Sequence, residues 1–134
     1  IKLYMSVNFN LNNFPVINIE LSGNFTSDNI VNEFFNNWLS LYELKKDFEI
    51  ILDTKNIENV SLKYGFYIAS IIKKIKKNKE KYKFLYKTTI YLYDKYIYRL
   101  IKSAFLFEEP LSYVILIFIN NKGDDEIEHI NPYK

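Results

Sequence analysis

The first part of the chain alternates between apolar and polar positions. The odd positions of 3–11 are all apolar, and most of the even positions between them are polar. This period-two pattern is typical of a strand with one buried face. A second alternating segment covers 16–21 and ends at Gly23. The connection between the two segments is short, so we expect them to form an antiparallel hairpin.

Three later segments repeat apolar residues every three or four positions, which predicts amphipathic helices. The first covers about 28–45, the second begins at Gly65 and fades near Lys81, and the third covers 96–107. The predicted buried face of the second helix consists of Phe66, Ala69, Ile72 and Ile75.

Three more strands are expected at 48–53, 84–93 and 113–119, where β-branched and aromatic residues are frequent. Strand-helix-strand units require right-handed crossovers and parallel neighbours. We therefore expect a single α/β domain over 1–119, with helices packed on a mixed β-sheet in the order β-β-α-β-α-β-α-β. Only the first hairpin is expected to be antiparallel. Residues 120–134 are polar and acidic, which predicts a C-terminal tail.

Composition narrows the classes of function. A chain of 134 residues suits one domain. It has no cysteine, which excludes disulfides, thiolate metal sites and cysteine nucleophiles. His129 is the only histidine, so a zinc site or a Ser-His-Asp triad would depend on that one residue. We expect no catalytic residues, no metal site and no cofactor.

The chain is also rich in residues with AT-rich codons. Asn, Lys and Ile together make up 52 of its 134 residues, which indicates an AT-rich genome such as that of a virus or a protist. The longest fully apolar run, 114–119, is far shorter than the ~20 residues of a membrane-spanning helix. We expect a soluble intracellular protein, in the cytoplasm, an organelle or a viral particle, without a membrane span.

The order of elements and a few residues resemble a STAS domain, the fold of bacterial anti-sigma factor antagonists and of the cytoplasmic tails of sulfate transporters. The segment 17–23, Ile-Asn-Ile-Glu-Leu-Ser-Gly, resembles the second strand of that family with its closing glycine. The segment 50–53, Ile-Ile-Leu-Asp, resembles the family's strand that ends in aspartate, and Gly65-Phe66 resembles the Gly-Leu opening of the next helix. The resemblance covers about 3–119 and implies a non-enzymatic module that binds or regulates another protein.

The chain departs from this family at the regulatory motif. The family has Asp-Ser-Ser-Gly with a phosphorylated serine before the glycine, whereas this chain has Leu-Lys-Tyr-Gly at 62–65. The phosphorylatable serine is therefore absent. Tyr64 takes the position before the glycine, and the resemblance gives it no role.

The expected contact site lies in a predicted loop at about 54–64 and at the start of the helix after it. Ligands and partners gather at the C-terminal ends of parallel strands, where helix N-termini favour anions. The candidate partner-binding or ligand-binding residues are Asp53, Asn56, Ser61, Lys63, Tyr64 and Gly65. In the structural alternative, Asp53 accepts hydrogen bonds from its own loop and Ser61 caps the helix.

Charge is uneven along the chain. Positions 73–102 contain eleven Lys or Arg residues and two acidic residues. The predicted basic face comprises Lys73, Lys74, Lys76, Lys77, Lys79, Lys81, Lys83 and Lys87. These lysines, interleaved with tyrosines, would suit a nucleic-acid backbone. A solvated lysine face is the favoured alternative, because the single arginine argues against a phosphate reader.

Two further groups of residues have structural alternatives. Tyr96, Tyr98, Leu106 and Phe107 lie off the main apolar stripe of the third helix and would present an apolar surface to a partner or make extra core contacts. The acidic residues at 124–128 with His129 do not have the spacing of a calcium loop, and a solvated segment is favoured.

The preferred interpretation is a non-catalytic protein-interaction or regulatory module that contacts its partner through the loop before the second helix and through that helix's surface. The alternative is a small structural subunit of a large assembly, a ribosome or a virion, docked through its basic, aromatic-rich face. A third hypothesis is an enzyme that uses Asp53 with Lys63 or Tyr64 on a phosphate-bearing ligand. The first strand is expected to be an edge strand, which can pair with the same strand of a second copy of the chain.

Overall fold

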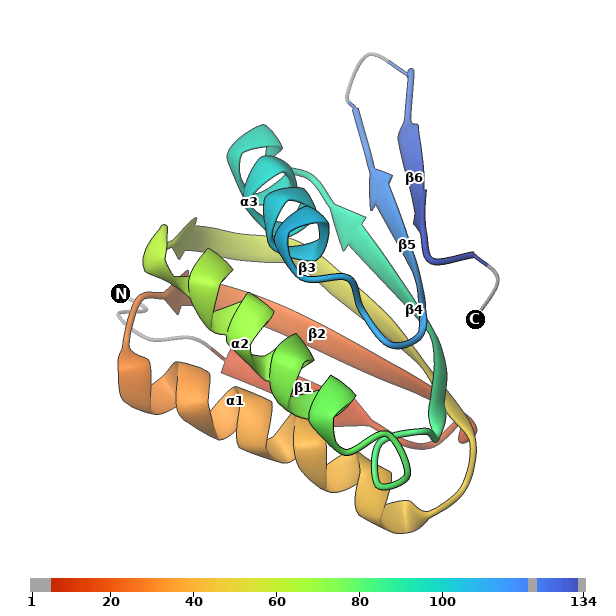
Figure 1. The fold of residues 1–134 in the computed structure, drawn as a ribbon. Helices are drawn as coiled ribbons and strands as arrows, with labels where there is room; N and C mark the ends of the chain where they lie inside the picture. The colour runs from red at the N-terminus through yellow and green to blue at the C-terminus, as the bar shows by residue number, and fades with distance from the viewer. Residues whose placement is uncertain (1–5, 121–122, 133–134) are drawn as a thin grey trace.

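Six strands form one mixed sheet and follow each other across it in chain order (Figure 1). The structure is a computed structural model, and it describes residues 6–120 and 123–132. The strands are β1 (Ser6–Asn10), β2 (Val16–Phe25), β3 (Phe48–Val60), β4 (Leu85–Leu92), β5 (Tyr113–Phe118) and β6 (Glu126–Ile130). Strands β2 to β5 are parallel, and β1 and β6 pair antiparallel at the two edges.

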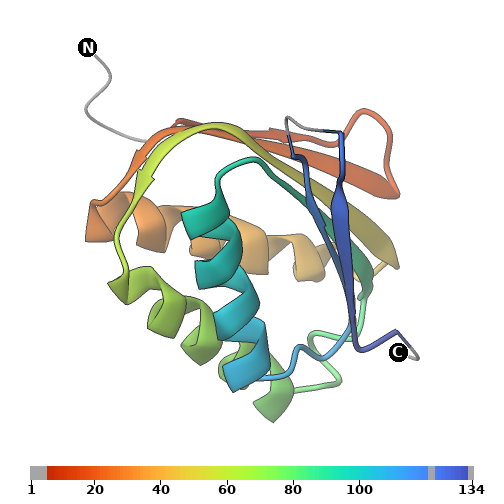
Figure 2. The same ribbon diagram turned by 90° about the horizontal axis from the view of Figure 1, so that it is seen from above.

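Three α-helices connect the parallel strands. They are α1 (Asp28–Ser40), which continues into the 3₁₀ turn η1 (Leu41–Leu44), α2 (Lys63–Lys77) and α3 (Lys95–Phe107). Each crossover leads to the next strand in the same direction, so right-handed connections put all three helices on one face of the sheet. Figure 2 shows the curved sheet with the helices on one side and no helix on the other.

The core lies between the sheet and the helices. Alternate residues of each central strand point towards the helices, and many of these are almost fully buried, as in Ile17, Phe48, Ile50 and Leu116. Tyr42 of η1 packs edge-to-face on Phe48 and closes one end of this core. The class expected from the sequence, a single α/β fold with a mixed sheet and helices packed on it, is therefore confirmed.

The expected order of elements is wrong at the C-terminus. Residues 126–130 form β6, which pairs with β5 along its whole length, so a second antiparallel pair closes the sheet. The segment predicted as a tail therefore contains an edge strand. Only Ile127 and Ile130 of β6 are apolar, because an edge strand is exposed on one side and needs little hydrophobic pattern.

The predicted loop after residue 53 is also wrong, because β3 continues to Val60. Its extension pairs with a matching extension of β2, which passes through Gly23 and ends at Phe25. The two strands shift register twice here, and Gly23 has a φ of 88° that favours glycine. These bulges break the period-two pattern, so the polar sequence 55–60 looks like a loop.

The helices begin and end within a few residues of their predicted limits, apart from the first. α1 ends at Ser40 and η1 follows it, and Lys45 then adopts a left-handed conformation with a φ of 53°. α2 begins two residues before Gly65 and ends at Lys77. Of the first predicted strand, Leu3 and Met5 lie outside the described residues.

Candidate functional site: a groove between two basic helices

The six residues predicted as a contact site do not form one site. Asp53 and Asn56 lie in β3, Ser61 lies in the link to α2, and Lys63 to Gly65 form the first turn of α2. Asp53 pairs in register with Glu20 and Tyr91 on the face of the sheet that no helix covers, whereas the helix turn lies over the opposite face. The sheet therefore separates the aspartate from the helix N-terminus.

The carboxylate of Asp53 is engaged within its own strand. Its Oδ1 accepts a hydrogen bond of 2.9 Å from the backbone N–H of Lys55. Burial and the nearby Asp53 carboxylate raise the pKa of Tyr93 above its usual value. These contacts agree with the structural alternative for Asp53. Ser61 does not cap α2, because the N-cap is Leu62 and no side chain makes the cap hydrogen bond.

Tyr64 is a core residue with 2% of its surface exposed. Its ring lies 5.7 Å from that of Phe25, and its hydroxyl donates a hydrogen bond of 2.6 Å to Oδ1 of Asp28 at the start of α1. Burial first, and then Asp28, raise the pKa of Tyr64 to about 12. Tyr64 therefore joins α2 to α1 and offers no free hydroxyl to a partner.

The predicted basic face is divided between several surfaces. Lys87 lies on the uncovered face of the sheet, where its Nζ is 3.3 Å from a carboxylate oxygen of Glu49. Lys76 pairs at 2.8 Å with Glu108, at the end of α3, and this pairing lowers the pKa of Glu108. The exposed remainder gathers at the end of α2 and in the turn after it, and comprises Lys73, Lys74, Lys77, Lys79, Lys81 and Lys83.

The structure instead reveals an apolar groove between α2 and α3, with a volume of about 320 Å³. Its floor consists of Gly65, Ala69, Leu100, Ser103 and Ala104, and its walls of Leu62, Phe66, Tyr96, Arg99 and Phe107. We call these ten residues the α2–α3 groove. Of the six residues of the predicted site, Gly65 alone lines this groove.

Small residues form the floor because the two helices approach closely there. A Cβ atom built on Gly65 would lie 3.0 Å from Cδ1 of Leu100, so glycine leaves room for α3 at this point. Ala69 and Ala104 continue the floor, and both are buried. The small side chains leave a hollow in the surface that larger residues would fill.

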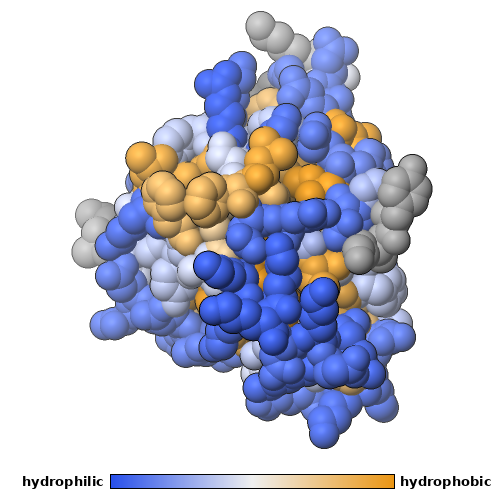
Figure 3. Space-filling model, in the orientation of Figure 1, coloured by the Kyte–Doolittle hydropathy of each residue, from blue (hydrophilic) through white to orange (hydrophobic). Residues whose placement is uncertain are grey.

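Large apolar side chains project from the walls of the groove. Phe66 is 72% exposed and Phe107 is 74% exposed, and their rings meet edge-to-face at 6.4 Å. Leu62 and Leu106 are similarly exposed. Figure 3 shows a cluster of hydrophobic side chains over the two helices, beside a hydrophilic region over the lower end of α2. Exposed clusters of this kind mark interaction surfaces.

The charge around the groove has one sign. α2 and α3 together contain seven lysines and one arginine and no acidic residue. Arg99 lines the groove itself, and Lys73 and Lys95 are exposed on the same two helices. Of the acidic residues that flank α3, Asp94 caps the helix by accepting from the N–H of Ile97, and Glu108 pairs with Lys76.

The sequence predicts the wall of this groove that α3 provides, but not the wall that α2 provides. Tyr96, Leu106 and Phe107, predicted to lie on a partner surface, are exposed, while Tyr98 is buried and stacks on Phe118. The prediction that Phe66 lies on the buried face of its helix is wrong. The buried face of α2 contains Tyr64, Ala69 and Ile72, and position 66 lies away from it.

The described residues contain no group of three His, Asp or Glu side chains arranged to hold a metal ion. The imidazole of His129 stacks on Tyr113 and shares a hydrogen bond with its hydroxyl. Among the residues that the structure describes, no helix is long and apolar enough to cross a membrane.

Comparison of the chain with models of known families and with curated proteins finds no match.

Proposed function

We propose that this chain is a non-catalytic protein-interaction module, STAS-like in character, and that it binds its partner through the α2–α3 groove. The observation that carries the proposal is the exposure of Phe66 and Phe107 beside a floor of small residues. The proposal keeps the surface of the second helix as the contact region. It replaces the predicted loop by α3, because residues 54–60 belong to β3. The STAS-like character is supported by the initial hairpin and the three strand-helix-strand units that follow it.

The partner that this surface fits is an acidic amphipathic helix. A helix laid along a groove inserts apolar residues spaced three and four apart. Phe66 and Phe107 would pack against such residues, and Arg99, with the exposed Lys73 and Lys95, would attract acidic residues on the flanks of the bound helix. A basic partner would be repelled by the same two helices.

Binding can be measured with a fluorescent, acidic, amphipathic peptide of about 18 residues and a peptide of the same composition in permuted order. We expect only the amphipathic peptide to bind. Phe66→Ser and Phe107→Ser should each weaken binding at least about tenfold, because each removes a buried apolar contact worth more than about 1.4 kcal/mol. Leu44→Ser, at a 44% exposed leucine in η1, is the matched control and should have no effect.

The charge contribution can be tested separately. Arg99→Glu should weaken peptide binding and slow association, while Lys46→Glu, at an exposed lysine before β3, should leave both unchanged. Equal binding of the permuted peptide would contradict the proposal. Binding to vesicles of anionic lipid in preference to the peptide would also contradict it, because the same aromatic and basic residues would then serve a membrane surface.

The second candidate function is a structural subunit docked on nucleic acid in a large assembly. The observation that favours it is the segment 73–83, which carries seven lysines and one acidic residue. Binding of a generic RNA should then weaken steeply as salt rises, because displaced counterions drive such binding. A flat salt response, or RNA binding unaffected by Lys77→Glu with Lys81→Glu, would eliminate this candidate.

A further inference from the structure

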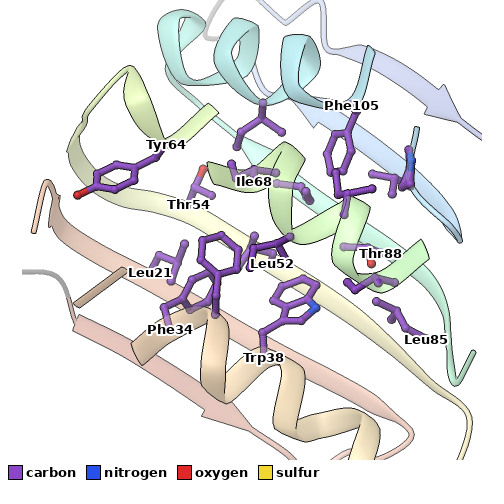
Figure 4. A pocket seen from close by; sticks show the side chains of 18 of the residues that line it. Leu21, Phe34, Trp38, Leu52, Thr54, Tyr64, Ile68, Leu85, Thr88 and Phe105 are labelled. Atoms are coloured by element: carbon purple, nitrogen blue, oxygen red, sulfur yellow. The ribbon is translucent and has the colours of Figure 1, made fainter. Parts of the chain in front are cut away.

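An apolar cavity lies between the sheet and the helices (Figure 4). It is on the inner side of α2 and α3, whereas the α2–α3 groove is on their outer side. Its walls come from all three helices and from the sheet: Phe34 and Trp38 of α1, Ile68 of α2, Phe105 of α3, and Leu52 and Leu85 of the sheet. In Figure 4 these side chains point towards a common space. The cavity therefore lies between the sheet and the helices, is built by residues distant in the sequence, and is partly open to the surface.

The cavity is larger than an ordinary packing defect. Its volume is about 130 Å³, whereas protein interiors contain few voids larger than a water molecule. Cavities of roughly 150 Å³ lined by aliphatic and aromatic side chains stay dry and take up benzene or xenon. A void of this size lowers stability unless something occupies it, since its lining lacks van der Waals contacts.

The lining offers almost nothing to a polar ligand. The hydroxyl of Thr54 donates a hydrogen bond of 2.7 Å to the backbone oxygen of Tyr91. The hydroxyl of Tyr64 is bonded to Asp28 and points away from the cavity in Figure 4. No buried side-chain nitrogen or oxygen of the described residues lacks a partner. The lining is almost wholly apolar, so an occupant with several hydrogen-bonding groups would lose most of its bonds to water without replacement.

A seam between α1 and α2 leads from the surface to this cavity. Phe35 and Trp38 of α1, and Ile68, Ile71 and Ile75 of α2, line the cavity and are only half-buried. The two helices meet there through side chains, as in the contact of 5.3 Å between the rings of Phe35 and Tyr67. The seam therefore gives a small molecule a route into the cavity between the two helices.

From this geometry we infer that the cavity is a binding site for a small apolar molecule, a hydrocarbon of about the size of benzene. The occupant replaces missing van der Waals contacts between α1, α2 and the sheet, and it contributes no hydrogen bond. This site is independent of the α2–α3 groove, which lies on the outer side of α2 and α3 and is lined by other residues except for Leu100.

The test uses the full chain with benzene and bromobenzene as probes. Trp38 is the only tryptophan in the chain and lines the cavity, so bromobenzene in the cavity should quench its fluorescence through the heavy-atom effect. Benzene should compete and restore the fluorescence. At a concentration ten times its Kd, benzene should raise Tm by about 5 °C.

Three substitutions test where the probe binds. Ile72→Phe adds volume at a buried residue that lines the cavity, and it should abolish quenching by bromobenzene. Ile117→Phe makes the same change on the uncovered face of β5 and should leave quenching intact. Phe66→Asn should also leave it intact, which separates the cavity from the α2–α3 groove.

The inference is overturned if neither probe changes Tm or Trp38 fluorescence in the wild-type chain. It is also overturned if Ile117→Phe or Phe66→Asn abolishes quenching as fully as Ile72→Phe does. If Ile72→Phe does not fold, the wild-type titrations together with Phe66→Asn and Ile117→Phe still decide the question. Peptide binding to the groove is measured separately, so failure of one proposal leaves the other standing.

Discussion

The hydroxyl of Tyr64 donates a hydrogen bond of 2.6 Å to Oδ1 of Asp28, and Nζ of Lys63 lies 2.9 Å from the same oxygen. Two successive residues at the start of α2 thus hold the first residue of α1. The contact joins two helix N-termini through a carboxylate, which compensates the positive ends of both helix dipoles.

Substitutions at Tyr64 should separate its ring from its hydroxyl. Tyr64→Phe keeps the packing on Phe25 and removes one hydrogen bond, so we expect a loss of about 1 kcal/mol in the free energy of unfolding. Tyr64→Ala removes a buried ring and should cost about 3 to 5 kcal/mol. Urea unfolding measures both. Equal effects of the two variants would show that the ring does not contribute to the core.

Acid should weaken the contact between α1 and α2. The hydrogen bond from Tyr64, and then Lys63, hold the pKa of Asp28 below its usual value. Asp28 therefore contributes stability above its unfolded pKa of about 4, and this contribution is lost as the pH falls through the lower folded pKa. Asp28→Asn should be less stable than wild type at pH 6.

The difference between these two chains should shrink as the pH approaches 2. Urea midpoints at pH 6, 4 and 2 measure it, and Asp47→Asn, at an exposed aspartate in the turn before β3, is the control. A difference that stays constant over this range would contradict the assigned role of the carboxylate.

Gly65 should tolerate one added carbon and not four. In Gly65→Ala the new Cβ meets the end of the Leu100 side chain, which can rotate, and alanine favours the helix by about 1 kcal/mol. We expect a net change within about 1 kcal/mol in the free energy of unfolding.

Gly65→Leu should lower the free energy of unfolding by about 1 to 3 kcal/mol through overpacking. It should also fill the α2–α3 groove and prevent binding of the acidic peptide. Peptide binding equal to wild type in Gly65→Leu would mean that the groove floor is not used.

Removing β6 should destabilise the domain, contrary to the behaviour of a tail. Truncation after Asn120 would expose the edge of β5, whose sequence Tyr-Val-Ile-Leu-Ile-Phe is almost entirely apolar. We expect a lower urea midpoint and concentration-dependent aggregation, because an exposed apolar edge pairs with other chains. Light scattering and urea unfolding measure these effects. A truncated chain as stable and monodisperse as the full chain would contradict this role for β6.

The sequence predicted those elements whose hydrophobic pattern is strong. The three helices and the parallel strands follow from apolar repeats that the core requires, such as those containing Ile50 and Leu116. β6 and the end of β3 could not be predicted, because edge pairing and bulges are set by the neighbouring strand rather than by a local pattern.

The groove was only half predictable for a related reason. Phe107 lies off the apolar stripe of α3, and that is visible in the sequence. Phe66 has the spacing of an apolar stripe with Ala69, and only the burial of Tyr64 and Ala69 in the structure shows which side of α2 faces the core. Which side of a helix with apolar residues on several sides is buried depends on its neighbours, and here Gly65 is the point at which α2 lies close to Leu100 of α3.

The order of the strands has a consequence for how the chain acquires its structure. Each strand pairs only with the strands before and after it in the chain, so no strand waits for a distant segment. Each closure spans one helix at most, which keeps its entropic cost small. The sheet can therefore grow from β1 to β6 during synthesis on the ribosome, with each newly emerged unit adding to a template that already exists.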